Sequence, residues 1–196
     1  MPPRIMINTN RNPSAAGSLR ERARRYGQGV RPALFALAVG VAIYYVTAPS
    51  SGPEVGTVAK DFDLALASGN GNRFRLSDHQ GTPVLVEAFA SWCRACRSAT
   101  PVLVEASRAE RAQQVRFVAV GVNDSPEDAY QAARSWGIPY DVAVDDGSFA
   151  RSYEISRLPT ILLVSAEGQV VHTASGSISR GKLEGWLDEV GAARKN

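Results

Sequence analysis

Side chains that commonly hold metals are scarce in this sequence of 196 residues, which has two histidines and two cysteines. A structural zinc site needs about four cysteine or histidine ligands. The histidines, His79 and His172, stand in distant segments, and neither has the spacing of a metal-ligand pair. We therefore expect no metal ion and no cofactor, and the two cysteines need another explanation.

Negative charge is scarce at the beginning of the chain. Residues 1–31 carry seven arginines and a single acid, Glu21, which gives a net charge of +6. The whole chain carries +3, so residues 32–196 carry −3. A nucleic-acid-binding protein carries its positive patch on the folded domain, whereas here the positive charge belongs to the tail. We therefore expect no nucleic acid among the partners.

Long apolar runs are also lacking, with one exception. Residues 32–53 contain no charged residue, and the strongly apolar part, Ala33 to Ala48, is 16 residues long. That length is marginal for a membrane span, which needs roughly 17–25 residues. Tyr44 and Tyr45, near the far end of this part, fit the aromatic belt of a membrane interface.

This apolar segment has three interpretations. It is a transmembrane anchor over residues 32–48, the core of a cleaved signal peptide, or a buried core helix. The preceding 31 residues exceed the charged segment of a typical signal peptide, and a buried helix beside an arginine-rich tail should show an amphipathic face, so we favour the anchor. For the anchor and the signal peptide alike, the arginines stay in the cytoplasm and the chain from about residue 54 is exported.

The rest of the chain predicts one α/β domain. Residues 1–31 are polar and predict a disordered tail, residues 49–55 a linker, and residues 56–193 the domain. Strand-like and helix-like patterns alternate in the domain, which predicts a sheet with parallel strands and helical cover. The predicted strands are 62–66, 73–77, 83–89, 115–122, 140–145, 160–164 and 169–175, and the predicted helices are 93–111, 125–137, 147–155 and 179–193.

The stretch FASWCRACRS, residues 89–98, contains both cysteines, after a buried strand and at the beginning of a helix. A helix N-terminus stabilises a thiolate, which is the nucleophilic form of cysteine. We expect Cys93 to be exposed at the helix tip and Cys96, one turn on, to be more buried and able to attack a mixed disulfide on Cys93. A structural disulfide that closes a loop of two residues stabilises little, so the pair is predicted to be redox-active.

Two further positions stand out. Leu158 and Pro159 come directly before the predicted strand 160–164, where a trans proline that begins a strand is the ordinary interpretation. Glu87 interrupts the apolar strand 83–89. It is either a strand-end glutamate paired with an arginine or a buried carboxyl, whose raised pKa would suit proton transfer near neutral pH.

The ordered motifs PVLVEAFASWCRAC and LPTILLVSAEGQVV, with the final helix, resemble the thioredoxin superfamily. The segment 115–155 between the motifs is similar to the TlpA/ResA/CcmG branch, whose members are membrane-tethered thiol–disulfide oxidoreductases of the bacterial cell exterior. The stretch DFDLAL…FRLSDHQGTPVLVEAF resembles the N-terminal hairpin of that branch. The likeness covers about residues 56–192. It implies a thioredoxin-like fold with a central mixed sheet flanked by helices, an N-terminal hairpin and a central β-α insertion.

The resemblance also implies roles for single residues. Cys93 would be the attacking thiol and Cys96 the resolving thiol, joined in a redox-active disulfide when oxidised. Trp92 would be the active-site aromatic residue, and Pro159, after Leu158, a cis-proline beside the cysteines. Glu87 has the spacing of the thioredoxin aspartate that helps to move the proton of the buried cysteine.

Three positions depart from the family pattern. The dipeptide between the cysteines is Arg94–Ala95 rather than the common form that ends in proline, Ala99 stands where some ResA-like reductases have an acid, and Lys60 stands where the branch often has proline. Arg94 adds a positive charge beside Cys93, which favours its thiolate. The first two departures lie where redox potential and partner choice are set.

The resemblance predicts a disulfide reductase of protein substrates at the cell inner membrane. It would span the membrane once, face the periplasm or cell exterior, and receive electrons from an inner-membrane donor. Family likeness alone suggests cytochrome c maturation. The alternatives are a disulfide oxidase or isomerase, and a redox-inert scaffold or copper-binding module that uses Cys93 and Cys96.

Overall fold

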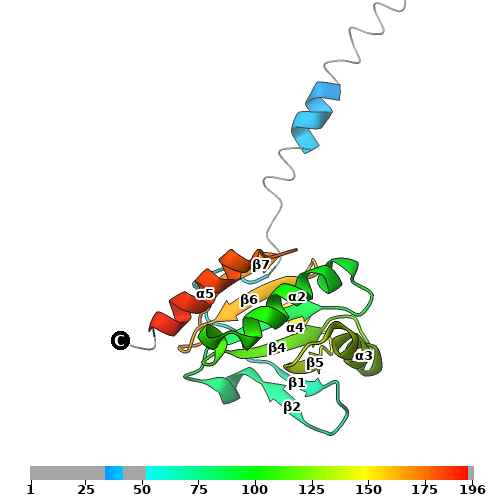
Figure 1. The fold of residues 1–196 in the computed structure, drawn as a ribbon. Helices are drawn as coiled ribbons and strands as arrows, with labels where there is room; N and C mark the ends of the chain where they lie inside the picture. The colour runs from blue at the N-terminus through cyan, green and yellow to red at the C-terminus, as the bar shows by residue number, and fades with distance from the viewer. Residues whose placement is uncertain (1–33, 42–51, 194–196) are drawn as a thin grey trace, which may run out of the picture. The chain divides into compact units, whose positions relative to one another are not determined.

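The computed structural model describes residues 34–41 and 52–193. The chain divides into two units, Met1–Pro49 and Ser50–Asn196. In the first unit, residues 34–41 form a helix (Figure 1). The side chains of this helix are exposed. Within the described ranges, no helix combines the length and the apolar character that a membrane crossing requires. The predicted tail 1–31 and the rest of the predicted anchor 32–48 lie outside the described residues.

The second unit is built on a seven-stranded sheet with the order β2-β1-β5-β4-β3-β6-β7. The strands β3, β4 and β5 are parallel to one another, and the remaining neighbours pair antiparallel. The predicted mixed sheet and the N-terminal hairpin of β1 and β2 are therefore confirmed. The strands are β1 Asp63–Leu66, β2 Arg73–Arg75, β3 Val84–Phe89, β4 Arg116–Gly121, β5 Asp141–Val144, β6 Thr160–Val164 and β7 Val170–Ser175.

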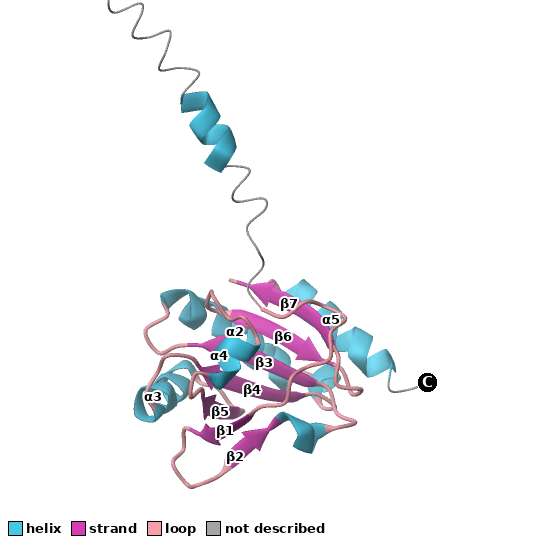
Figure 2. Cartoon of the chain, turned by 180° about the vertical axis from the view of Figure 1, so that it is seen from behind, coloured by secondary structure: helices cyan, strands magenta, loops and turns pink. Residues whose placement is uncertain are grey.

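Helices cover both faces of the sheet because the central strands are apolar on both sides. Val86 and Ala88 of β3 belong to a core cluster with Phe149 of α4, whereas Leu85 belongs to a second cluster with residues of α2 and α5. Alanines of α3 pack against Phe89, on the same side as Leu85. Figures 1 and 2 show α4 on the opposite side of the sheet from α2 and α5. The helices are α2 Arg94–Arg108, α3 Pro126–Trp136, α4 Ser148–Ser152 and α5 Arg180–Ala193.

The ends of α3 follow from local chemistry. Ser125 caps the helix by accepting a hydrogen bond from the backbone N–H of Asp128 at 3.0 Å, and Pro126 occupies the first turn. Gly137 ends the helix with φ of 73°, a left-handed conformation that favours glycine. The prediction for this helix is confirmed.

Several elements are shorter than the sequence predicts; α4, for example, covers Ser148–Ser152 rather than 147–155. The strand predicted over 73–77 ends at Arg75, and a 3-10 helix follows over Leu76–His79. The Asp61 carboxylate accepts a hydrogen bond from the backbone N–H of Ser77 at 2.9 Å, so this N–H is not available to a sheet ladder. The helix predicted over 93–111 ends at Arg108, because Ala109 adopts an extended conformation before a short 3-10 helix, Glu110–Ala112.

Candidate active site

The two cysteines form a disulfide at the N-terminus of α2, after the carboxyl end of β3. Cys93 is the N-cap residue, and its Sγ accepts a hydrogen bond from the backbone N–H of Cys96 at 3.1 Å. Any negative charge that develops on Cys93 would therefore face a backbone donor and the positive end of the helix. This is the arrangement that stabilises a cysteine thiolate.

The two sulfurs differ in access to solvent. Cys93 is 8% exposed and Cys96 is 0% exposed. The prediction that Cys93 is exposed is wrong for the oxidised protein, because its side chain packs in a cluster with Phe89 and Ala90. The predicted order holds, since Cys96 is the more buried of the two. An incoming thiol or disulfide therefore meets Cys93 before Cys96.

The loop after β4 holds the segment that precedes Cys93. The Asp124 carboxylate accepts hydrogen bonds from the backbone N–H of Ser91 at 2.5 Å and from its hydroxyl at 2.8 Å. The indole N–H of Trp92 donates to the backbone carbonyl of Asn123 at 3.3 Å, while 65% of the Trp92 surface stays exposed. Trp92 is thus a fixed apolar surface next to Cys93.

Sequence reasoning missed Asn123 and Asp124. A signal for them existed, because both follow β4, which runs parallel to β3. The carboxyl ends of parallel strands meet at one edge of a sheet. Residues after β4 are therefore expected to lie beside residues after β3, where Ser91 and Cys93 stand.

The third segment at this edge is the beginning of β6. Thr160 pairs with Ala88, which brings the preceding residues to the carboxyl end of β3. The peptide bond between Leu158 and Pro159 is cis, and Pro159 is buried. Leu158 is half-buried and packs against the core cluster that contains both cysteines. The fold therefore brings this dipeptide and the disulfide together.

Glu87 lies in the middle of β3 with its side chain completely buried. Tyr140 donates a hydrogen bond to Oε2 of Glu87 at 3.1 Å, and the Thr100 hydroxyl lies 3.4 Å from Oε1. Burial raises the pKa of Glu87 to about 7, and the hydrogen bonds from Tyr140 and Thr100 oppose that rise. No arginine of the described residues forms an ion pair with Glu87, so the arginine-paired alternative is wrong.

Arg94 lies in the first turn of α2 with an exposed side chain. Solvent screens an exposed charge, so its effect on Cys93 is modest.

Within the described ranges, no group of three or more His, Cys, Asp or Glu side chains is arranged to hold a metal ion.

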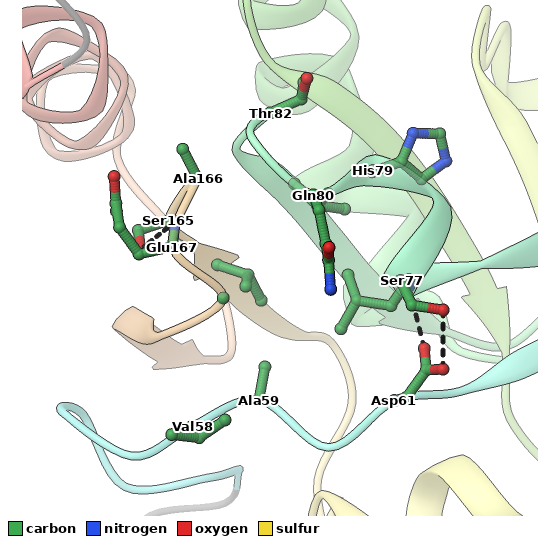
Figure 3. A pocket seen from close by; sticks show the side chains of 14 residues that line it. Val58, Ala59, Asp61, Ser77, His79, Gln80, Thr82, Ser165, Ala166 and Glu167 are labelled. Carbon is green, nitrogen blue, oxygen red and sulfur yellow. Dashed lines mark hydrogen bonds between the residues drawn. The ribbon is translucent and has the colours of Figure 1, made fainter.

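A pocket of about 480 Å³ lies elsewhere on the domain (Figure 3). Its lining includes Val84 at the beginning of β3 and Val164 at the end of β6, which runs antiparallel to β3. The six residues of β3 separate this pocket from Cys93 by a strand length of roughly 17 Å. Figure 3 shows the Asp61 carboxylate at the pocket paired with Ser77. The pocket is therefore separate from the disulfide site.

Comparisons with known proteins agree with this geometry. The family model described as Redoxin matches residues 54–187. The thiol-disulfide oxidoreductase ResA of Bacillus subtilis (strain 168) is 29% identical over 153 residues, which cover 77% of this chain and 84% of the relative. The thiol:disulfide interchange protein DsbE of Xylella fastidiosa (strain 9a5c) is 30% identical over 139 residues, 70% of this chain and 69% of the relative.

A solved structure supports the same fold. The crystal structure of a putative thiol:disulfide interchange protein DsbE from Chlorobium tepidum superposes with a TM-score of 0.61 at 26% identity. The match covers 73% of this chain and 99% of that structure. The thioredoxin-like fold and the ResA/CcmG-like resemblance predicted from the sequence are confirmed.

Proposed function

Since the chain belongs to the Redoxin family and is a thiol–disulfide oxidoreductase, we propose that it reduces protein disulfides with the Cys93–Cys96 dithiol. The observation that supports disulfide exchange by this pair is the disulfide at the N-terminus of α2, with one sulfur nearer to solvent and the other fully buried. Disulfide exchange needs this difference in exposure. The first thiol has to reach a sulfur of the substrate, whereas the second thiol reacts only with the first one, inside the protein. The reducing direction is proposed from the resemblance to the ResA-like branch.

In the first step, the Cys93 thiolate attacks one sulfur of a substrate disulfide. A bond forms between Cys93 and the substrate, the substrate disulfide breaks, and the other substrate sulfur leaves as a thiolate that takes a proton from water. The backbone N–H of Cys96 and the α2 N-terminus stabilise the attacking thiolate. Trp92, Leu158 and Pro159 would supply the surface on which the substrate backbone lies.

In the second step, Glu87 accepts the proton of the Cys96 thiol. The Cys96 thiolate then attacks Cys93, the mixed disulfide breaks, and the substrate leaves as its second thiolate. The substrate has gained two electrons and the protein has lost two, which leaves the Cys93–Cys96 disulfide that the structure contains. A base with a pKa of about 7 suits this transfer near neutral pH.

Arg94 bears on the direction of electron flow. A stabilised Cys93 thiolate favours the dithiol and raises the reduction potential. One exposed charge moves the potential by roughly 20 mV at most, whereas about 150 mV separates thioredoxin from the strong oxidant DsbA. The effect of Arg94 on the reduction potential is therefore too small to turn a reductase into an oxidase.

A reductase needs an electron donor, for which we propose an inner-membrane protein. Apocytochrome c is the substrate that the resemblance suggests.

We propose that residues 32–48 anchor the chain in the inner membrane with the domain outside the cytoplasm. Residues 1–31 carry +6, and cytoplasmic flanks of membrane spans are rich in arginine and lysine. A membrane-impermeant thiol reagent added to intact, reduced spheroplasts is then expected to label Cys93. The Cys93→Ser, Cys96→Ser double variant is the unlabelled control.

Two outcomes would contradict parts of this topology. Labelling that appears only after the inner membrane is lysed would place the domain in the cytoplasm. A mature protein that begins near residue 49 would replace the anchor with a cleaved signal peptide and keep the exported domain.

A further inference from the structure

The side chains around Glu87 form a hydrogen-bonded chain that reaches from the surface of the domain to the Cys96 turn. Tyr140 is half-buried and donates to Oε2 of Glu87 at 3.1 Å. Thr100, which is fully buried, lies 3.4 Å from Oε1 of Glu87 and 2.9 Å from the backbone carbonyl of Cys96. The three side chains thus connect three segments: the residue before β5, the middle of β3 and the first turns of α2.

Thr100 has one hydroxyl proton and two acceptors within reach. When Glu87 is ionised, its carboxylate is the stronger acceptor, and the Thr100 hydroxyl donates to Oε1. When Glu87 is protonated, its own O–H can donate to the Thr100 oxygen, and the Thr100 hydroxyl donates to the Cys96 carbonyl. In the structure the Thr100 hydroxyl lies 2.9 Å from the Cys96 carbonyl, the ordinary contact of a helical threonine with the carbonyl four residues before it, and 3.4 Å from Oε1 of Glu87, so both acceptors are close to it.

Tyr140 separates Glu87 from solvent. Two surface hollows, of about 320 and 170 Å³, both include Tyr140 in their lining. The ring of Tyr140 also packs against Phe117, with ring centroids 5.5 Å apart. The side chain is therefore held between the surface and the buried carboxyl, with its hydroxyl directed at Glu87.

Among the described residues, no charged side chain forms a hydrogen bond or an ion pair with Glu87. The elements packed against β3 bring Ala119 of β4 and Ile161 of β6 opposite Glu87, and neither residue can ionise. The nearest charged neighbour of Tyr140 in sequence, Asp141, forms an ion pair with Arg116, and neither affects the pKa of Glu87. In the oxidised protein Cys96 does not titrate, which leaves the Tyr140 hydroxyl as the titratable group that faces Glu87.

We propose that Tyr140 and Thr100 are positioning residues, which control the ionisation of Glu87 by hydrogen bonding and transmit its protonation state to the Cys96 turn. Tyr140 holds one carboxylate oxygen in both protonation states. Thr100 changes its hydrogen-bond acceptor when Glu87 gains or loses a proton. The proposal rests on the function proposed above for Glu87 only where it concerns catalysis, since the hydrogen bonds themselves can be measured without turnover.

The test is a titration of Glu87 by carboxyl ¹³C NMR in the oxidised full-length protein. Hydrogen bonds from Tyr140 and Thr100 favour the carboxylate, so their loss raises the pKa of Glu87 further above its wild-type value. Tyr140→Phe keeps the ring in place and is expected to raise the pKa by about one unit, the scale of a hydrogen bond to a charged group. Thr100→Val is expected to give a smaller rise, and Thr100→Ser, which keeps the hydroxyl, none.

The matched control is Tyr130→Phe. Tyr130 lines the same hollow as Tyr140, but its hydroxyl contacts Arg134 instead of Glu87. This variant is expected to leave the Glu87 titration unchanged. If Tyr140→Phe and Thr100→Val also leave it unchanged, the proposal is overturned.

A second signal tests the change of acceptor at Thr100. In a pH titration of the wild-type protein, the ¹³C chemical shift of the Cys96 carbonyl is expected to change with a midpoint at the pKa of Glu87. Thr100→Val is expected to remove this pH dependence. A carbonyl titration that persists undiminished in Thr100→Val overturns the link through Thr100. A further outcome is a shift in the pKa of Glu87 in the variants without a shift in the pH dependence of the attack by Cys96. That result would support the claim that Tyr140 and Thr100 set the pKa of Glu87, and it would contradict the proposed role of Glu87 as the base.

Discussion

Replacement of Cys96 by serine is expected to stop turnover and to trap substrates on Cys93. Cys96 is fully buried and lies one helical turn from Cys93, so it acts as an intramolecular thiol that attacks the mixed disulfide. Well-oriented intramolecular groups have effective concentrations of about 10⁵ M or more, which millimolar external thiols cannot match. The rate of substrate release should therefore fall by several orders of magnitude.

The measurement is mass spectrometry of the variant after reaction with a disulfide peptide. We expect one peptide attached per chain through Cys93, and release of the peptide when a strong reductant is added. Cys93→Ser is the matched control, and it should give no adduct because Cys96 is inaccessible to the peptide. An adduct on Cys96 in that control, or unchanged turnover of Cys96→Ser, would contradict the assigned order of the two thiols.

The second large effect is expected for Glu87→Gln. The change keeps the shape of the side chain and removes its ability to accept a proton. General base assistance is typically worth about 10²–10⁴-fold, so attack by Cys96 on the mixed disulfide should slow by that factor. In the wild-type protein this step should accelerate as pH rises through about 7, where Glu87 becomes a carboxylate. Glu87→Gln should lack that component.

Stopped-flow measurements of release from a preformed mixed disulfide between pH 6 and pH 9 (roughly three units around neutrality) would test this role. Glu105→Gln is the control, because Glu105 lies on the outer surface of α2 in an ion pair with Arg180. It should leave both the rate and its pH dependence unchanged. The same pH profile in Glu87→Gln as in the wild-type protein would make Glu87 a structural residue.

Local patterns predicted most of the fold. The caps of α3 at Ser125 and Gly137 and the apolar run of β3 are properties of neighbouring residues, and the structure confirms them. The end of β2 could not be predicted in the same way. It depends on Asp61, which lies 16 residues from Ser77 in sequence. The Asp61 carboxylate accepts a hydrogen bond from the backbone N–H of Ser77, so this N–H does not pair with a neighbouring strand.

The candidate active site likewise contains residues that local motifs predict and residues that they do not predict. Cys93, Cys96, Trp92 and Pro159 stand in short motifs, and the parallel arrangement of β3 and β4 with the pairing of β6 brings these motifs together. The partners of Glu87 depend on tertiary register instead. Tyr140 is 53 residues away in sequence and directly precedes β5, whose pattern gives no sign of a buried hydroxyl contact.

The most direct test of the account is the reduction potential of the Cys93–Cys96 couple. The full-length protein, purified in detergent, would be equilibrated with glutathione or dithiothreitol couples, and its free thiols counted at each potential. We predict a value near that of thioredoxin, about −270 mV, with a shift of roughly 20 mV to more negative values in Arg94→Ala. A value near that of DsbA, about −120 mV, would contradict the reductase and identify the protein as an oxidase.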